Sequence, residues 1–204
     1  MAASRMPGLP QTAAGKIRVM TRTPLPDADA VLAFWFEELA PAQWWAASAD
    51  LDQTIRERFG RLLAAASVCE LAHWRISPEG RLAEVLVLDQ FSRQVHRGHA
   101  RAFAQDPLAL GLAQTAVSLE ADLALPPPRR HFLYMPYMHS ESALIHREAL
   151  RLFQAPGLER ALEAERRHWA VIERFGRYPH RNAALGREST PEERVFIATP
   201  GTGF

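Results

Sequence analysis

The chain has 204 residues, of which 48% are hydrophobic, and its 24 basic and 23 acidic side chains give a formal net charge of +1. This length suits a single domain, and so large an apolar fraction can bury a sizeable core, which excludes a disordered polymer. A near-neutral chain has no overall field to attract nucleic acid or anionic lipid, so neither nucleic acid nor a membrane is an expected partner.

The cysteine content and the lengths of the apolar runs indicate the compartment. Cys69 is the only cysteine, so it forms no internal disulfide, and we expect it to be a buried filler. No apolar run approaches the roughly 18 residues that span a bilayer, and the first residues do not have the pattern of a secretory signal. These features predict a cytoplasmic protein.

The chain divides into a short tail and one domain. Residues 1–26 lack periodicity and are expected to form a flexible tail, within which Met20 is an alternative start. Residues 27–204 are expected to form a single all-helical domain. Asp27 is placed to cap its first helix, which Pro41 should end.

A second helix is predicted from Asp50 to Trp74, because apolar residues recur at helical spacing between them. Trp44 and Trp45 form a short aromatic element before this helix. Because aromatic side chains dominate core burial, we expect these tryptophans in the core rather than on a platform that stacks on bases or sugars.

The next helix is predicted to begin at Ser77, followed by a proline and an acidic residue at positions favoured in a first turn. Its apolar stripe becomes polar partway along, where Asp89 and Arg93 lie one turn apart. A charge on a core-facing side is costly unless it is paired, so we expect these two residues to pair with each other or with another element. A structural ion pair and a binding site are equally compatible with this pattern.

Three features follow in the middle of the chain. Asp106 and Pro107 read as a helix cap followed by the first helical position. The prolines at 126–128 are expected to prevent helix formation and to give a stiff connection. After an apolar run, His139 and Glu141 stand at the entrance of a further helix, beside amide groups with positive partial charge.

The last long helix is predicted from Leu158 to Phe175, and Gly176 is placed to terminate it in the left-handed conformation. A capping box at Thr190 then begins a short terminal helix. No stretch alternates with period two for long enough to support a sheet. The predicted fold class is therefore all-α, with helices packed as antiparallel pairs.

The loop at 175–190 carries the densest group of polar residues in the chain. If it converges with the polar residues near 89 and 139, arginines could clamp a small anion while a histidine paired with a carboxylate moves a proton. The candidate catalytic residues are His139, Glu141 and His180. The candidate ligand-binding residues are Asp89, Gln90, Arg93, His168, Arg177, Arg181, Asn182, Arg187 and Glu188.

Other interpretations of these residues remain open. His139, Glu141, His168 and His180 are acceptable metal donors, but they lack the close His-Glu-x-x-His spacing and the arginines would repel a cation, so neither a metal nor another cofactor is predicted. The arginine–carboxylate pairs could have a purely structural role and hold the end of a helical array in place. Stacked helices could also form a non-catalytic scaffold for a protein partner.

Four runs of residues carry a resemblance to a known family. They are 31–36, 88–93, 138–142 and 175–190. The chain resembles the bacterial family known as domain of unknown function 924 over nearly everything after the tail, which implies an all-helical, tetratricopeptide-like α/α superhelix and no established reaction. Ser92 and Gln94 stand where the family pattern has proline and asparagine. Ile145 and His146 replace an Asp-Gln pair, so a carboxylate is lost there and His146 adds a donor instead.

Overall fold

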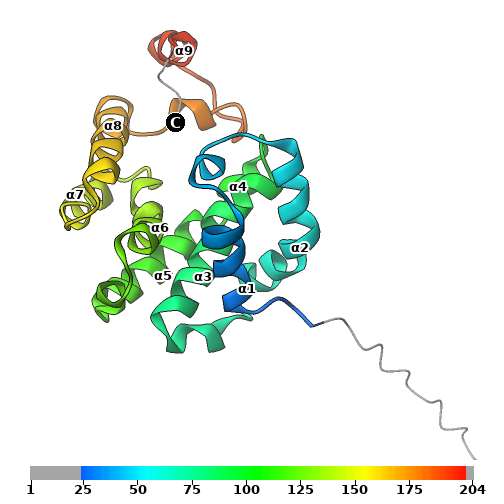
Figure 1. The fold of residues 1–204 in the computed structure, drawn as a ribbon. Coiled ribbons are helices and arrows are strands. Elements are labelled where there is room, and N and C mark those ends of the chain that lie inside the picture. The colour runs from blue at the N-terminus through cyan, green and yellow to red at the C-terminus, as the bar shows by residue number, and fades with distance from the viewer. Residues whose placement is uncertain (1–23, 201–204) are drawn as a thin grey trace, which may run out of the picture.

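The computed structural model describes residues 24–200, which form helices and turns without any strand (Figure 1). The all-α prediction is confirmed. The predictions for the tail up to residue 23, including Met20, lie outside the described residues. The elements are, in chain order, α1 (Ala28–Ala33), η1 (Phe34–Glu38), η2 (Pro41–Trp44), α2 (Ala49–Ser67), η3 (Ala72–Ile76), α3 (Pro78–Leu86), η4 (Val87–Phe91), α4 (Ser92–Val95), η5 (Ala100–Phe103), α5 (Asp106–Ser118), η6 (Ala121–Ala124), α6 (Pro127–Met138), α7 (Ala143–Leu152), α8 (Glu159–Phe175), η7 (Pro179–Arg181) and α9 (Pro191–Ala198).

Helix α3 forms the centre of the core, because it packs against α1, α5 and α6. Its side chains Leu82, Val85 and Leu86 are completely buried. Ser77 caps α3 as predicted, since its Oγ accepts a hydrogen bond from the backbone N–H of Gly80 at 3.1 Å. The helix continues through η4 into α4, and these two elements carry the buried polar residues Asp89, Gln90 and Gln94.

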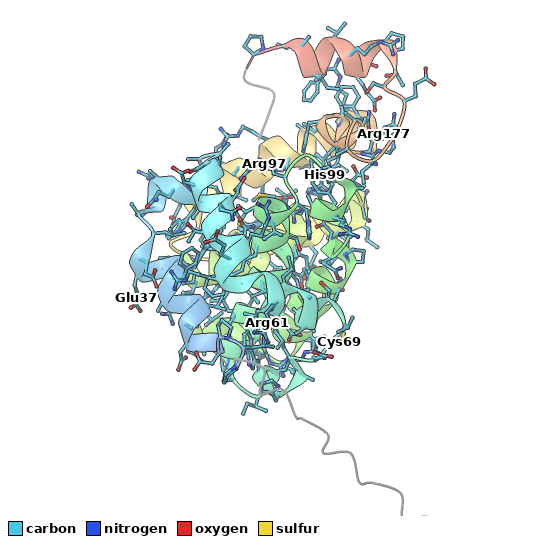
Figure 2. The ribbon with its side chains drawn as sticks, turned by 90° about the vertical axis from the view of Figure 1, so that its right-hand side faces the viewer. Glu37, Arg61, Cys69, Arg97, His99 and Arg177 are labelled. Atoms are coloured by element: carbon cyan, nitrogen blue, oxygen red, sulfur yellow. The ribbon has the colours of Figure 1, made fainter. Side chains whose placement is uncertain are left out.

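The helices from α5 to α8 follow one another, and each packs on the next. This arrangement is compatible with stacked helical pairs, while the tetratricopeptide-like superhelix stays a prediction. Figure 2 shows α9 beyond the rest of the domain, where it packs on η7 and the ring of Phe196 lies 5.0 Å from that of Phe175. No helix in residues 24–200 has both the length and the apolar character that a membrane crossing requires.

Two predicted helix ends differ from the structure. The helix expected to reach Trp74 ends at Ser67, and two residues later Cys69 has a left-handed φ of 63°. At this turn the Cys69 side chain is exposed, so the prediction of a buried cysteine is wrong. The first helical segment ends at Glu38, before Pro41, which instead begins the short helix η2.

The prolines at 126–128 start a helix. Pro126 is the N-cap of α6, and Pro127 and Pro128 occupy its first turn. Amide hydrogens in a first turn have no partner within the helix, so a proline there removes no hydrogen bond. The prediction of a non-helical connection at 127 and 128 is wrong because it applied a rule for helix interiors to a helix start.

Candidate functional site

A cavity of about 1010 Å³, named the central cavity below, lies between two groups of elements. One wall comes from α6, α8 and η7, and the other from η4, α4 and η5, with Trp44 and Trp45 at one end. In Figure 1, α8 and α4 stand on opposite sides of α6. The volume is at the upper end of the range for small-molecule sites.

Two helices line the central cavity along their length, because each turns one face toward it. On α6, His131, Met135 and His139 are spaced four residues apart and so lie on one face. On α8, the face toward the cavity contains Ala161 and Ala164. Their small side chains leave space that larger residues would fill.

Helix α8 runs alongside α6 in the same direction. At one end, Gly157 lies against Pro127, so closely that a Cβ at 157 would come within 2.9 Å of the proline side chain. At the other end, the ring of His168 lies 5.8 Å from that of Tyr178, whose hydroxyl donates a hydrogen bond to the carbonyl oxygen of Met138 at 2.5 Å. The two ends of the central cavity are therefore set by the two ends of these helices.

His139 in the wall of the central cavity forms a hydrogen-bonded pair with Asp89 behind it. His139 Nδ1 lies 2.7 Å from Asp89 Oδ1, and the same oxygen lies 3.0 Å from Arg93 Nη1, which confirms the predicted pairing of Asp89 with Arg93. The second oxygen accepts a hydrogen bond from Gln90 Nε2 at 2.5 Å. Asp89 and Gln90 belong to the π-helical turn η4, a form that is frequent at functional sites.

The electrostatics of this pair keep the histidine neutral and the carboxylate ionised. Burial alone would raise the pKa of Asp89, but Arg93 and His139 outweigh it and hold that pKa well below its usual value. Burial and then Arg93 lower the pKa of His139, against the opposing effect of Asp89. An ionised Asp89 at Nδ1 places the ring proton there, and no described residue forms a hydrogen bond with Nε2, which is left as a proton acceptor.

Asp106 joins two arginines of the cavity wall. Its carboxylate oxygens accept hydrogen bonds from Arg93 at 3.0 and 3.1 Å and from Arg181 Nη1 at 3.1 Å. Arg181 Nη2 also donates to the carbonyl oxygen of His139 at 2.9 Å. The N-cap of α5 is Gln105, so the prediction that Asp106 caps this helix is wrong. Its carboxylate instead fixes the positions of the two guanidinium groups.

His131 and His168 also line the central cavity without charge at neutral pH. Burial, with a smaller effect of His139, lowers the pKa of His131 to about 4. Burial likewise lowers the pKa of His168 to about 3, although the carbonyl oxygen of Ala164, 2.8 Å from its Nδ1, acts in the opposite direction. His180 also lines the cavity, and its side chain is exposed. A bound anion would therefore meet neutral imidazoles, and its negative charge would raise their pKa values.

The cavity wall carries an excess of positive charge. It is lined by Arg93, Arg97, Arg160, Arg167 and Arg181, and by no aspartate or glutamate from residues 24–200. Asp52, Asp89 and Asp106, which pair with three of these arginines, do not line the cavity. Arg160 and Arg167 are exposed and have no hydrogen-bond or salt-bridge partner among the described residues. Two cavity arginines therefore have no direct ion-pair partner in the described part of the chain.

A second polar network, named the terminal clip below, consists of Glu141, Arg177, Asn182, Arg187 and Glu193. Arg187 donates to both oxygens of Glu141 at 2.6 and 2.9 Å, and Arg177 donates to both oxygens of Glu193 at 2.7 and 2.8 Å. Asn182 connects the two pairs, since it accepts from Arg187 at 2.9 Å and donates to Glu193 at 3.2 Å. Figure 2 shows Arg177 close to α9. No residue of the terminal clip lines the central cavity.

The structure separates the predicted site residues into two groups. The residues that line the central cavity are Gln90, Arg93, His139, His168, His180 and Arg181. Asp89 lies behind this wall, and it rather than Glu141 is the carboxylate bonded to His139. Arg177, Asn182 and Arg187 belong to the terminal clip together with Glu141. Glu188 is exposed, and its carbonyl oxygen accepts a hydrogen bond from Arg177 at 3.0 Å.

Sequence reasoning missed several residues of the cavity, among them Trp44, Trp45, Arg160 and Arg167. Both tryptophans line the cavity, but Trp44 is half-buried against the core whereas Trp45 is 58% exposed, so the prediction of a core position is wrong for Trp45. Arg160 and Arg167 are seven residues apart and share a helix face with small alanines. Arginines and small residues on one face of a helix were the signal in the sequence that could have indicated a cavity-facing side of α8.

The described residues offer no metal site, since no three histidine, cysteine, aspartate or glutamate side chains among them are grouped to hold an ion. His146 was an added donor in the sequence analysis, but it is buried and does not line the central cavity. Its Nδ1 lies 2.6 Å from Glu165, and its Nε2 lies 2.8 Å from the carbonyl oxygen of Ser140.

Comparison with known proteins agrees with the resemblance noted from the sequence. Residues 31–201 match the family described as bacterial protein of unknown function, DUF924. The chain belongs to this family. The solved structure of a protein of unknown function, ATU0120 from Agrobacterium tumefaciens, is similar to it with a TM-score of 0.80 and 37% identity, covering 84% of this chain and 96% of that one. No curated protein matches the chain.

Proposed function

We propose that this protein binds a small anionic metabolite in the central cavity and that His139, held by Asp89, exchanges a proton with it. The observation that carries the proposal is that Arg160 and Arg167 have no ion-pair partner among the described residues and stand in a wall to which none of those residues contributes a carboxylate. Guanidinium groups suit carboxylate and phosphate because their planar forks match these anions.

The geometry of His139 supports the proton-transfer part of the proposal. A general base must be neutral at the working pH and must present a free nitrogen to the ligand. Burial lowers the pKa of His139, and Asp89 occupies Nδ1, so Nε2 meets both requirements. Asp89 acts as a positioning residue because it holds the ring and its tautomer.

A non-catalytic scaffold for a protein partner is the alternative from the sequence. It would be expected to have an exposed apolar groove, and its arginine network would be fully paired within the protein. The terminal clip has this property, but the central cavity does not, because Arg160 and Arg167 are unpaired among the described residues. The charge balance therefore favours the ligand site.

Thermal unfolding with and without added anions tests the proposal. Inorganic phosphate, pyrophosphate and small carboxylates are screened, and a ligand at about 100 times its Kd adds roughly 2.7 kcal/mol to the stability. Arg167→Ala should lose most of this stabilisation. The matched control is Arg147→Ala, which removes the same charge from an exposed position on α7 outside the cavity and should respond like the unmodified protein.

Arg167 is a better position for this substitution than Arg181. Arg181 is bonded to Asp106 and to His139, so its removal would disturb the cavity wall as well as the charge. Arg167 has no hydrogen-bond or salt-bridge partner among residues 24–200 that its removal would disturb. Equal stabilisation of Arg167→Ala and Arg147→Ala, or no response of the unmodified protein to any anion, would contradict the proposal.

A further inference from the structure

The central cavity has an aromatic end that the anion-binding proposal leaves unexplained. Trp45 is 58% exposed although it is one of the largest apolar side chains. Its ring stacks on Phe132 at 5.9 Å and 12° and on His131 at 5.7 Å and 26°. Exposed aromatic surface is costly in water, and a fixed ring in a cavity wall is suited to stack on a planar ligand.

The neighbouring tryptophan holds this end in place. Trp44 Nε1 donates a hydrogen bond to the carbonyl oxygen of Trp35 at 2.7 Å, and the Trp44 ring meets Phe132 edge-on at 5.1 Å. Trp44 in turn contacts Trp45 edge-on at 6.4 Å. The aromatic surface is therefore built before any ligand arrives.

The cationic end lies at the opposite end of the same helices. His131 and His139 are eight residues apart on α6, which places them about 12 Å apart along the helix axis at 1.5 Å per residue. Because α8 runs in the same direction, Arg167 and His168 lie toward the His139 end, and Arg181 is bonded to the carbonyl oxygen of His139. A ligand that uses both ends must be elongated.

We infer that the ligand of the central cavity is an elongated anion with a planar ring at one end, seated on Trp45, and a phosphate or carboxylate at the other, held by Arg167 and Arg181. This inference rests on the proposed function, since it names the class of anion. Arg160, near the aromatic end of α8, adds positive charge there and so favours an electron-rich ring over a cationic one.

Affinities for matched probes test the inference by calorimetry. Adenosine monophosphate, adenosine diphosphate and naphthyl phosphate carry both a ring and a phosphate, ribose 5-phosphate carries only the anion, and adenosine carries only the ring. Stacking on an aromatic side chain contributes substantially to the binding free energy of each ring. We therefore expect the best ring-bearing phosphate to bind at least tenfold more tightly than ribose 5-phosphate. The nucleotides and naphthyl phosphate distinguish a nucleotide ligand from another aromatic anion.

Substitution at Trp45 separates stacking from other effects. Trp45→Ala should remove the tenfold advantage of the ring while leaving the affinity for ribose 5-phosphate unchanged, and Trp45→Phe should restore most of it. Leu144→Ala is the matched control, because it removes an exposed apolar side chain from α7, outside the cavity, and should change neither affinity.

The outcomes distinguish the two proposals. If ring-bearing and ring-free phosphates bind equally, or if Trp45→Ala weakens both by the same factor, the inference about the ring is overturned and the anion site stands. If none of these anions binds, both are overturned.

Discussion

The central cavity and the terminal clip are built from the same residue types but differ in charge balance. In the terminal clip, Arg177 and Arg187 each donate to both oxygens of one carboxylate, and Asn182 joins the two pairs. In the central cavity, three carboxylates partner three of five arginines, and Arg160 and Arg167 have no described partner.

This difference shows that arginine content alone does not distinguish a binding site from a structural network. A guanidinium that already binds a carboxylate in two-pronged fashion has little left to offer a ligand. An unpaired guanidinium beside a cavity keeps its N–H groups available to bind a ligand. The polar loop at 175–190 contributes to both regions, with Arg181 in the cavity wall and Arg187 in the terminal clip.

The largest effect is expected at the buried carboxylate of the cavity wall. Asp89→Ala should lower the free energy of unfolding by about 3 to 5 kcal/mol, because it leaves the buried groups of Arg93 and His139 without their common partner. Urea denaturation measures this change. Asp52→Ala, which removes the partner of the half-exposed Arg97, should cost no more than about 1 kcal/mol. Equal losses in the two variants would show that burial does not set the strength of these pairs.

The terminal clip should matter for stability and not for binding. Arg187→Ala removes hydrogen bonds to Glu141, Asn182 and the carbonyl oxygen of Tyr178, and it should lower the unfolding free energy by about 2 kcal/mol. Arg167→Ala should stay within about 0.5 kcal/mol of the unmodified protein. For phosphate binding the order reverses, with at least a tenfold loss in Arg167→Ala alone. A loss of binding in Arg187→Ala at intact fold would erase the distinction between the regions.

Acidification should destabilise the cavity through its histidines. The folded-state pKa values of His131 and His168 are about 4 and about 3, whereas an unfolded histidine titrates near about 6.5. Below the unfolded pKa the unfolded chain binds more protons, so stability falls between pH 6.5 and 5 by up to about 1.4 kcal/mol per pH unit for each histidine. His168→Gln should reduce this slope in urea denaturation curves. An unchanged slope would mean that His168 is protonated in the folded protein.

Proton uptake on anion binding is the smallest expected effect. An anion beside His139 raises the pKa of its imidazole, so binding near pH 6 should take up a fraction of a proton. Calorimetric titrations in buffers of different ionisation enthalpy measure this fraction. The uptake should be lower in His139→Gln, and no uptake by the unmodified protein would remove His139 from the site.

Local signals in the sequence predicted much of the fold. Caps at Asp27, Ser77 and Thr190 and the left-handed stop at Gly176 occur as expected, because they depend only on residues within one turn. The start of α6 at Pro127 was missed because proline is favourable in the first turn of a helix but disrupts a helix interior.

The site was harder to predict because its composition depends on long-range packing. The contact between Asp89 and His139 spans 50 residues, and that between Arg181 and Asp106 spans 75. The sequence placed Asp89 correctly on the helical run that begins after Ser77, but its placement of His139 at the entrance of the following helix is wrong, because His139 is the C-cap of α6 and α7 begins at Ala143. It also did not show that Asp106 would be shared or that Trp45 would remain exposed. Which arginines stay unpaired is decided only when all helices are in place.

The location of a bound oxyanion is the most direct test of the central claim. A crystal structure of the protein with tungstate, whose scattering marks its position, would show where the free positive charge acts. The account predicts tungstate in the central cavity within hydrogen-bonding distance of Arg167 or Arg181. Tungstate bound at the terminal clip, with none in the central cavity, would contradict it.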